Sequence, residues 1–282
     1  MIYEEIKIWD NQDFYVPTAP EYEPILTVYS LSNSSEVDLN KKRPAILIAP
    51  GGGYNMVSER ESESVMAQFL AKGYVCAILK YSVRNVSSAV YPSQLLEISR
   101  AMWLLRLNSE KYQVDVDKIA VIGFSAGGHL AGNLAVAWNR PFISEKLGMP
   151  AGMNKPNAAI LAYAVLSSQT FSHKGSFDSL IGENASEEQI LDVSCDLLVG
   201  AHTPPTFLWH TANDNVVPVE NTLLFASALS KHEIPFEVHI YPQGSHGLSI
   251  ATNEVGSPNE HVSNWVSACL SWTELVLDNK QF

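Results

Sequence analysis

Apolar residues in this chain are grouped into two kinds of segment that follow one another from residue 43 onward. Short apolar runs with few polar positions are typical of strands covered on both faces, and we expect such strands at 43–50, 74–82, 118–125, 157–167, 205–211 and 235–242. Longer segments with apolar residues at helical spacing predict helices at 58–73, 91–110, 126–138, 219–233 and 261–279. Strands and helices in alternation predict an α/β fold, with a mostly parallel sheet and helices on both faces.

The N-terminal part of the chain has a different pattern. Residues 2–10 and 25–31 alternate apolar and polar positions, as strands with one side facing solvent do. We therefore expect two antiparallel strands at one edge of the sheet.

Capping residues predict where the helix at 58–73 begins and ends. Ser58 is a preferred N-cap residue, and Glu61 three residues later completes the pattern of a capping box. Gly73 is the predicted end of the helix, because glycine readily takes the left-handed conformation that terminates helices.

Two stretches interrupt the alternation of strands and helices. Residues 139–156 are rich in Pro, Gly and Met, and residues 168–203 carry polar residues without a clear period. Loops of this length in a compact domain usually cover or build a functional site. We expect a single domain over residues 1–282, with 168–203 as a lid or insert over the active site.

Composition and charge exclude some classes of partner. The net charge of −12 disfavours nucleic acid and strongly anionic substrates as ligands. The cysteines show neither metal-ligand nor disulfide spacing: Cys76 and Cys269 lie in apolar patterns and are predicted core thiols, whereas Cys195 lies in a polar stretch. No apolar run approaches the length of about 18 residues that spans a membrane, and the N-terminus lacks the features of a signal peptide. We expect a cytoplasmic protein with no membrane partner, and a homo-oligomer is one option for its assembly.

A candidate nucleophile lies where the strand at 118–125 passes into the following helix. Gly123-Phe124-Ser125-Ala126-Gly127 is a G-x-S-x-G pattern in the strand–helix context that a nucleophile elbow needs. The glycines allow a turn so sharp that the serine side chain is lifted clear of the sheet. The N-terminus of the helix beneath it favours developing negative charge.

A serine nucleophile needs a base, and the base needs an acid that orients it. Of the five aspartates that follow Ser125, only Asp214 comes directly after a predicted strand. Of the eight histidines, His246 lies just past the last strand between Gly244 and Gly247, which leaves it free to reach sideways. His173, in the insert, is the main rival for the role of base.

The three glycines at 51–53, at the end of the strand at 43–50, predict a backbone that approaches a ligand closely. Attack on an ester carbonyl creates an oxyanion that needs preorganised N–H donors. We expect one donor to be the amide of Ala126 and the others to come from this glycine run.

The segments "GGGY", "GFSAGG", "NDNVVP" and "GSHG", in this order, resemble the α/β-hydrolase esterases related to hormone-sensitive lipase and bacterial acetyl-xylan esterases. The resemblance implies Ser125 as nucleophile, Asp214 as orienting acid and His246 as base. It further implies that the amides of Gly52, Gly53 and Ala126 form the oxyanion hole. One departure is Pro50, which stands where such enzymes commonly have a histidine that supports the loop.

These residues together predict a serine carboxylesterase that cleaves short-chain acyl esters, with acetylated sugars as candidate substrates, through an acyl-enzyme and without a metal or organic cofactor. Tyr54 and Phe124, beside the glycines and the serine, are predicted to contact substrate by narrowing the acyl pocket and offering a ring face to a sugar. A serine peptidase or a dienelactone-type lactone hydrolase remains an alternative, because a triad does not define the leaving group. An inactive binding protein is the alternative from another class.

Overall fold

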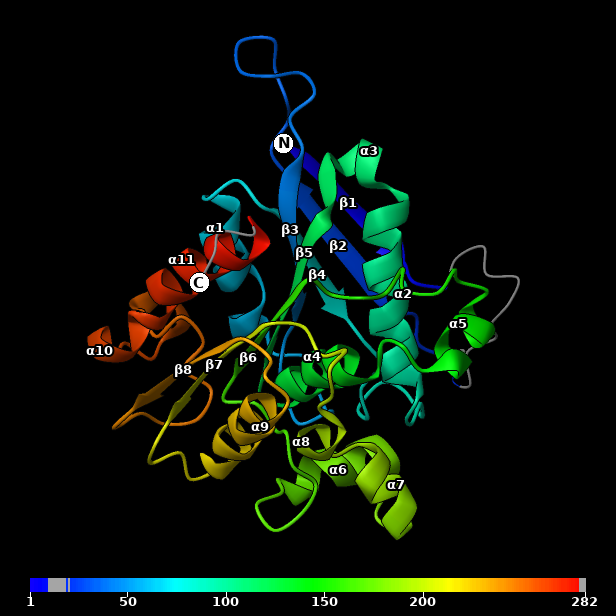
Figure 1. Ribbon diagram of the computed structural model, residues 1–282, viewed down its shortest axis with the longest axis vertical. Coiled ribbons are helices and arrows are strands. Elements are labelled where there is room, and N and C mark those ends of the chain that lie inside the picture. Colours follow the sequence, from blue (N-terminus) through cyan, green and yellow to red (C-terminus); the bar gives the residue numbers. More distant parts are fainter. Residues whose placement is uncertain (10–18, 20, 279–282) are drawn as a thin grey trace.

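The structure is a computed structural model that describes residues 1–9, 19 and 21–278, and it is built on one eight-stranded sheet. The strand order is β1-β2-β4-β3-β5-β6-β7-β8 (Figure 1). The strands are β1 (Ile2–Lys7), β2 (Ile25–Ser30), β3 (Arg43–Ala49), β4 (Val75–Lys80), β5 (Val114–Phe124), β6 (Ala158–Ala162), β7 (Thr206–Thr211) and β8 (Phe236–Tyr241).

The direction of the strands agrees with the hydrophobic pattern. β3 to β8 are mutually parallel, whereas β2 runs antiparallel to both β1 and β4. The predicted mostly parallel sheet with two antiparallel strands at one edge is therefore confirmed. The last residue of the first predicted strand, Asp10, and that of the last predicted helix, Asn279, lie outside the described residues.

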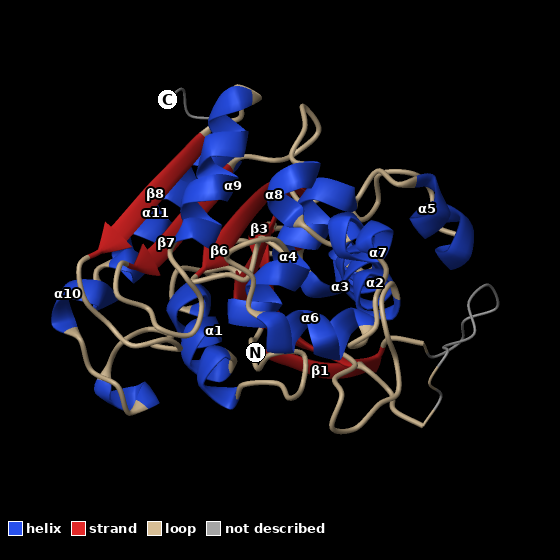
Figure 2. Cartoon of the chain, turned by 90° about the horizontal axis from the view of Figure 1, so that it is seen from below, coloured by secondary structure: helices blue, strands red, loops and turns tan. Residues whose placement is uncertain are grey.

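Helices cover both faces of the sheet (Figure 2). The longer helices and their short neighbours are α1 (Glu63–Leu70), α2 (Ser93–Leu107), α3 (Ser109–Tyr112), α4 (Ser125–Ala137), α9 (Glu220–Lys231), α10 (Glu260–Ser263) and α11 (Trp265–Leu277). α2, α4 and α9 pack on one face of the sheet, and α1 and α11 pack on the other. In the described part of the chain, no helix is both long enough and apolar enough to cross a bilayer.

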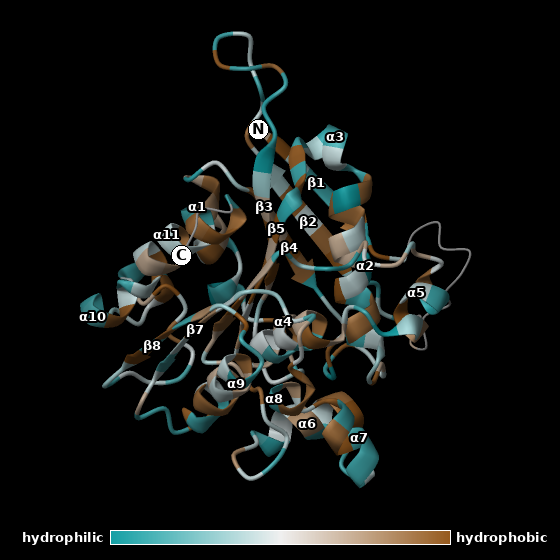
Figure 3. Ribbon diagram, viewed as in Figure 1, coloured by the Kyte–Doolittle hydropathy of each residue, from teal (hydrophilic) through white to brown (hydrophobic). Residues whose placement is uncertain are grey.

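Strand β3 shows why the central strands are continuous apolar runs. Its alternate residues Ala45 and Leu47 contribute to the core beneath α2, α4 and α9, whereas Ile46 and Ile48 contribute to the core beneath α1 and α11. A strand buried on both faces has no position for a polar side chain. Figure 3 shows the resulting apolar centre of the sheet.

The predicted start of the first helix is wrong. The segment divides into a short 3₁₀ helix, η1 (Glu59–Glu61), and α1, and the Ser58 side chain makes no capping hydrogen bond. Glu61, the expected second half of the capping box, turns into the interior, where its carboxylate accepts hydrogen bonds from the Gly51 amide and the Tyr163 hydroxyl. Long-range partners here override the local capping preference.

The two irregular stretches contain short helices. Residues 139–156 include α5 (Pro141–Leu147), and the insert 168–203 folds into α6 (Lys174–Ile181), α7 (Glu187–Asp192) and α8 (Cys195–Leu198). Cys195 is fully buried although its surrounding sequence is polar, and all three cysteines are buried free thiols. Because Cys195 of α8 belongs to the core beneath α2, α4 and α9, the insert packs against the rest of the domain.

His129, one turn into α4, attaches both the glycine turn and the insert. Its Nε2 donates a hydrogen bond to the Val193 carbonyl (2.7 Å), and its Nδ1 accepts one from the Tyr54 hydroxyl (2.7 Å). Because a carbonyl can only accept, the Val193 contact fixes which ring nitrogen carries the proton. Neutral His129 therefore connects α4, the insert and the segment after the glycine turn, all of which border the C-terminal ends of the strands.

Close packing at the start of α4 depends on a glycine. A Cβ atom at Gly127 would lie 2.1 Å from the Ala49 oxygen and 2.3 Å from the Pro50 oxygen. These are backbone atoms and cannot rotate away. We predict that Gly127→Ala lowers the free energy of unfolding by about 3 kcal/mol or more, measured by urea unfolding.

The matched control is Gly175→Ala, because the atom nearest to a Cβ at Gly175 is 3.7 Å away. We expect this control to unfold like the unsubstituted protein. Equal stability of the two variants would show that α4 does not need its close approach to β3.

A second prediction concerns the pH dependence of stability. Burial lowers the pKa of His129 to about 4 from its ordinary value of 6.5. Between these two pH values the unfolded chain binds this proton and the folded protein does not, so stability rises with pH across the window and is lost as pH falls. We expect the unfolding free energy of the unsubstituted protein, relative to that of His129→Gln, to fall by about 2–3 kcal/mol between pH 7 and pH 4.5.

Urea unfolding of both proteins at several pH values measures this difference, and the comparison cancels other titrating groups. Parallel pH profiles for the two proteins would contradict the assignment of a buried neutral imidazole to position 129.

Candidate active site

Ser125 lies at the junction of β5 and α4 in a strained conformation. Its φ is +52°, a left-handed value that a residue with a side chain rarely adopts. The strain follows from the sharp turn between strand and helix. The same turn requires a residue without a side chain at Gly123, because a Cβ there would lie 2.1 Å from the Gly127 oxygen. Ser125 begins α4, so its side chain stands at the positive end of the helix dipole.

The structure brings Ser125, His246 and Asp214 together in one hydrogen-bonded chain. Nε2 of His246 lies 2.8 Å from Oγ of Ser125, and Nδ1 of His246 lies 2.7 Å from Oδ2 of Asp214. Asp214 follows β7 and His246 follows β8, so both lie at the C-terminal ends of the parallel strands, as the end of β5 does. The carboxyl ends of parallel strands meet there, which is why residues far apart in sequence converge.

Asp214 is held as a carboxylate by its surroundings. Burial by itself would raise its pKa, but hydrogen bonds from His210, His246 and the amide of Val216 hold the pKa of Asp214 well below its ordinary value. Oδ1 accepts from the amides of Val216 (2.9 Å) and Val217 (3.0 Å), and Nε2 of His210 lies 3.4 Å from Oδ2. These donors fix the carboxylate so that Oδ2 faces His246.

His173, the rival base, lies beside the site without contacting the serine. Its Nδ1 is 2.8 Å from Oγ of Ser176 at the start of α6. Burial lowers the pKa of His173, and the nearby His246 lowers it further. In this geometry His246 contacts Ser125, whereas His173 is bonded within the insert.

The glycine turn lies against the elbow, and its three residues differ. The Gly51 amide donates to Oε2 of Glu61 (2.7 Å) and so faces away from a substrate. Gly52 and Gly53 have φ of +123° and +65°, conformations that side chains oppose, and both are partly exposed. Ala126, the second residue of α4, is buried beside the serine. The predicted donors therefore come from two segments, the glycine turn after β3 and the start of α4.

The predicted contact of Tyr54 and Phe124 with substrate is corrected. Tyr54 is 2% exposed and uses its hydroxyl on His129, and Phe124 is 0% exposed and packs against Tyr163 and Trp265. Neither ring has a free face for a sugar. Their positions in sequence beside the glycines and the nucleophile placed them near the site, but the packing directs both rings into the core.

Two residues of the site were not predicted from the sequence in this role. Glu61 was interpreted as a capping residue, and Tyr163 lies in an apolar strand-like run with no local signal of function. The Tyr163 ring packs edge-on against His246 with 5.0 Å between ring centroids, and its hydroxyl donates to Glu61 (2.6 Å). The left-handed φ of Tyr163, +35°, is visible only in the folded structure.

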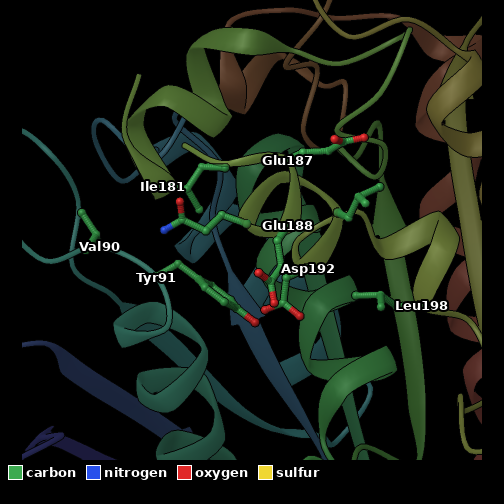
Figure 4. Close-up of a pocket in the computed structure, with 9 residues that line it drawn as sticks. Val90, Tyr91, Ile181, Glu187, Glu188, Asp192 and Leu198 are labelled. Carbon is green, nitrogen blue, oxygen red and sulfur yellow. The ribbon is translucent and has the colours of Figure 1, made fainter. Parts of the chain in front are cut away.

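A cavity of about 750 Å³ lies between the loop before α2 and the helices of the insert. In Figure 4, Tyr91 stands on one wall and the carboxylates of Glu187, Glu188 and Asp192 project from α7 on the other. None of its lining residues belongs to the Ser125–His246–Asp214 chain or to the glycine turn. Among the described residues, no group of three His, Cys, Asp or Glu side chains is arranged to hold a metal ion.

Known proteins with similar sequences and structures include enzymes that act on xylan and acetyl esters. Endo-1,4-beta-xylanase B of Butyrivibrio fibrisolvens is 36% identical over 253 residues, covering 88% of this chain and 38% of the relative. Acetylxylan esterase of Xylanibacter ruminicola is 26% identical over 219 residues, covering 76% of this chain and 42% of the relative. This chain thus spans less than half the length of either relative.

A solved structure agrees over nearly the whole chain. The acetyl ester-xyloside bifunctional hydrolase from Caldicellulosiruptor lactoaceticus is 38% identical, with a TM-score of 0.83 over 97% of this chain and 96% of that one. The sequence profile of the BD-FAE family matches residues 35–229, from the segment before β3 to α9. The chain therefore belongs to the BD-FAE family and has the α/β-hydrolase fold.

Proposed function

We propose that this protein is a serine carboxylesterase that works through an acyl-enzyme. The observation that carries the proposal is the continuous chain of hydrogen bonds from Ser125 through His246 to Asp214. A serine hydroxyl is a poor nucleophile unless a neighbouring base removes its proton, and this arrangement provides that base and its orienting acid.

The geometry supports a specific order of events. Nε2 of His246 accepts the proton of Ser125 as Oγ attacks the ester carbonyl, and Asp214 stabilises the imidazolium that forms. The amides of Gly52, Gly53 and Ala126 donate hydrogen bonds to the oxyanion. His246 then gives its proton to the leaving alcohol, and a water molecule, activated in the same way, cleaves the acyl-enzyme.

The proposed substrates are short acyl esters of neutral, polar alcohols, with acetylated xylose-type sugars as the leading candidates. Two relatives support this class by their names, an acetylxylan esterase and an acetyl ester-xyloside hydrolase. The net charge of −12 disfavours anionic esters. The insert beside the serine begins with the mostly polar sequence "SQTFSHKGS", which suits a sugar better than a long acyl chain.

The first functional prediction separates the two candidate bases. Ser125→Ala and His246→Ala should each lower kcat for p-nitrophenyl acetate by about 10⁴- to 10⁶-fold, because each removes a member of a unit that acts together. His173→Ala should retain kcat within about tenfold, since it removes no proton carrier.

Labelling with a fluorophosphonate probe provides a second readout, because only an activated serine reacts. Labelling should be lost in the Ser125 variant and retained in the His173 variant. Retained labelling in Ser125→Ala would place the nucleophile elsewhere, and a larger loss in His173→Ala than in His246→Ala would move the base into the insert.

The next prediction concerns the acyl chain. Each methylene that finds an apolar pocket contributes about 0.8 kcal/mol, so an enzyme with a long acyl channel should prefer long esters. We expect kcat/KM across p-nitrophenyl esters from acetate to decanoate to be highest for acetate or propionate. We also expect acetate release from acetylated xylo-oligosaccharides. A maximum at eight or more carbons together with no acetate release from sugars would refute this substrate class.

A further inference from the structure

Glu61 is a buried carboxylate beside the proposed triad, but it is not a member of it. It ends η1, between the glycine turn and α1, and only 2% of the residue is exposed. Burying a carboxylate is costly unless donors compensate for the lost water. The groups that donate to Glu61 therefore indicate what it holds in place.

The first donor is the glycine turn. Oε2 of Glu61 accepts the Gly51 amide at 2.7 Å. The turn is pressed against the elbow at this point, because a Cβ on Gly51 would lie 2.6 Å from the Phe124 oxygen and 3.0 Å from Cβ of Ser125. The hydrogen bond fixes the peptide plane on which the directions of the next two amides, those of Gly52 and Gly53, depend.

The second donor connects Glu61 to the loop that carries His246. Oε1 accepts the Tyr163 hydroxyl at 2.6 Å, and the oxygen of that hydroxyl accepts the Ser249 amide at 2.9 Å. The Tyr163 ring also packs edge-on against the His246 imidazole. One carboxylate thus contacts the glycine turn directly and the base through a single tyrosine.

We propose that Glu61 is a positioning residue for the esterase reaction. It holds the amides of the oxyanion hole and the loop that carries His246 in the positions relative to Ser125 that the reaction needs. This inference rests on the proposed function. It also explains the departure at Pro50: the Pro50 carbonyl accepts the Tyr81 hydroxyl (2.7 Å), and support for the next residue comes from a carboxylate ten positions further along the chain.

A carboxylate suits this task better than its amide. Glu61 accepts one hydrogen bond at each carboxylate oxygen, whereas a glutamine keeps one acceptor oxygen and puts an NH₂ group, which can only donate, opposite the other donor. Burial raises the pKa of Glu61, and the hydrogen bonds from Tyr163 and Gly51, with the charge of protonated His246, oppose that rise. An ionised Glu61 also favours the imidazolium that forms at His246 during attack.

The experiment compares Glu61→Gln and Tyr163→Phe with a matched control, Glu97→Gln. Glu97 is equally buried, and its carboxylate accepts from the amide and hydroxyl of Ser82. Neither of these donors belongs to the glycine turn, to Tyr163 or to the loop that carries His246. Titration with a fluorophosphonate to completion counts reactive serines, so that kcat for p-nitrophenyl acetate is expressed per active site. A general loss of structure then lowers the number of sites and leaves kcat unchanged.

We expect Glu61→Gln and Tyr163→Phe each to lower kcat by about 10- to 100-fold, with KM within about threefold of the unsubstituted value. The double variant should be little worse than the more impaired single variant, because both act through one network. Glu97→Gln should keep kcat within about twofold even if its melting temperature falls.

Three results would overturn the inference: kcat within twofold in Glu61→Gln, additive losses in the double variant, or an equal loss of kcat in Glu97→Gln. If Glu61→Gln does not fold, the kcat of Tyr163→Phe tests the inference, and a value within twofold of the unsubstituted protein overturns it. An unsubstituted protein that cleaves no ester refutes the proposed function itself. Normal ester cleavage that Ser125→Ala abolishes, together with an unaffected Glu61→Gln, refutes the role of Glu61 alone.

Discussion

The close approach of α4 to the ends of β3 and β5 is the constraint on which the rest of the site depends. Gly123 and Gly127 have no room for a Cβ atom, and between them Ser125 is held at a left-handed φ. The same contact presses Gly51 against the elbow. Packing energy from the two cores thus maintains a strained backbone that no local preference would favour, and it places the serine beside the start of the glycine turn.

Two buried carboxylates serve this site in different surroundings. Asp214 has several donors, and its pKa is held far below the ordinary value. Glu61 has two donors, and burial raises its pKa. The first contacts His246 directly and the second reaches it through Tyr163. The donors around each carboxylate, rather than its being Asp or Glu, therefore determine its pKa and whether it contacts the His246 imidazole directly or through another side chain.

The insert is attached to the domain through buried polar contacts as well as apolar packing. His129 hydrogen-bonds Val193 of the insert and Tyr54 after the glycine turn, and the Phe177 ring of α6 packs edge-on against the same imidazole. A shift of the insert would therefore disturb the glycine turn through a single side chain. The insert, which also carries His173 and Ser176, is thus linked through His129 to Tyr54 after the glycine turn.

The sequence by itself determined the order of strands and helices, the elbow around Ser125, and the strand-end positions of Asp214 and His246, because periodicity and turn residues act within a few positions of the chain. It could not determine which way Glu61 and Tyr54 point. Their directions depend on partners 102 and 75 residues away, and only the packed sheet brings those partners together. The tertiary structure therefore decided that Glu61 holds the glycine turn instead of capping a helix, and that Tyr54 belongs to the core, because burial makes distant hydrogen-bond partners outweigh local preference.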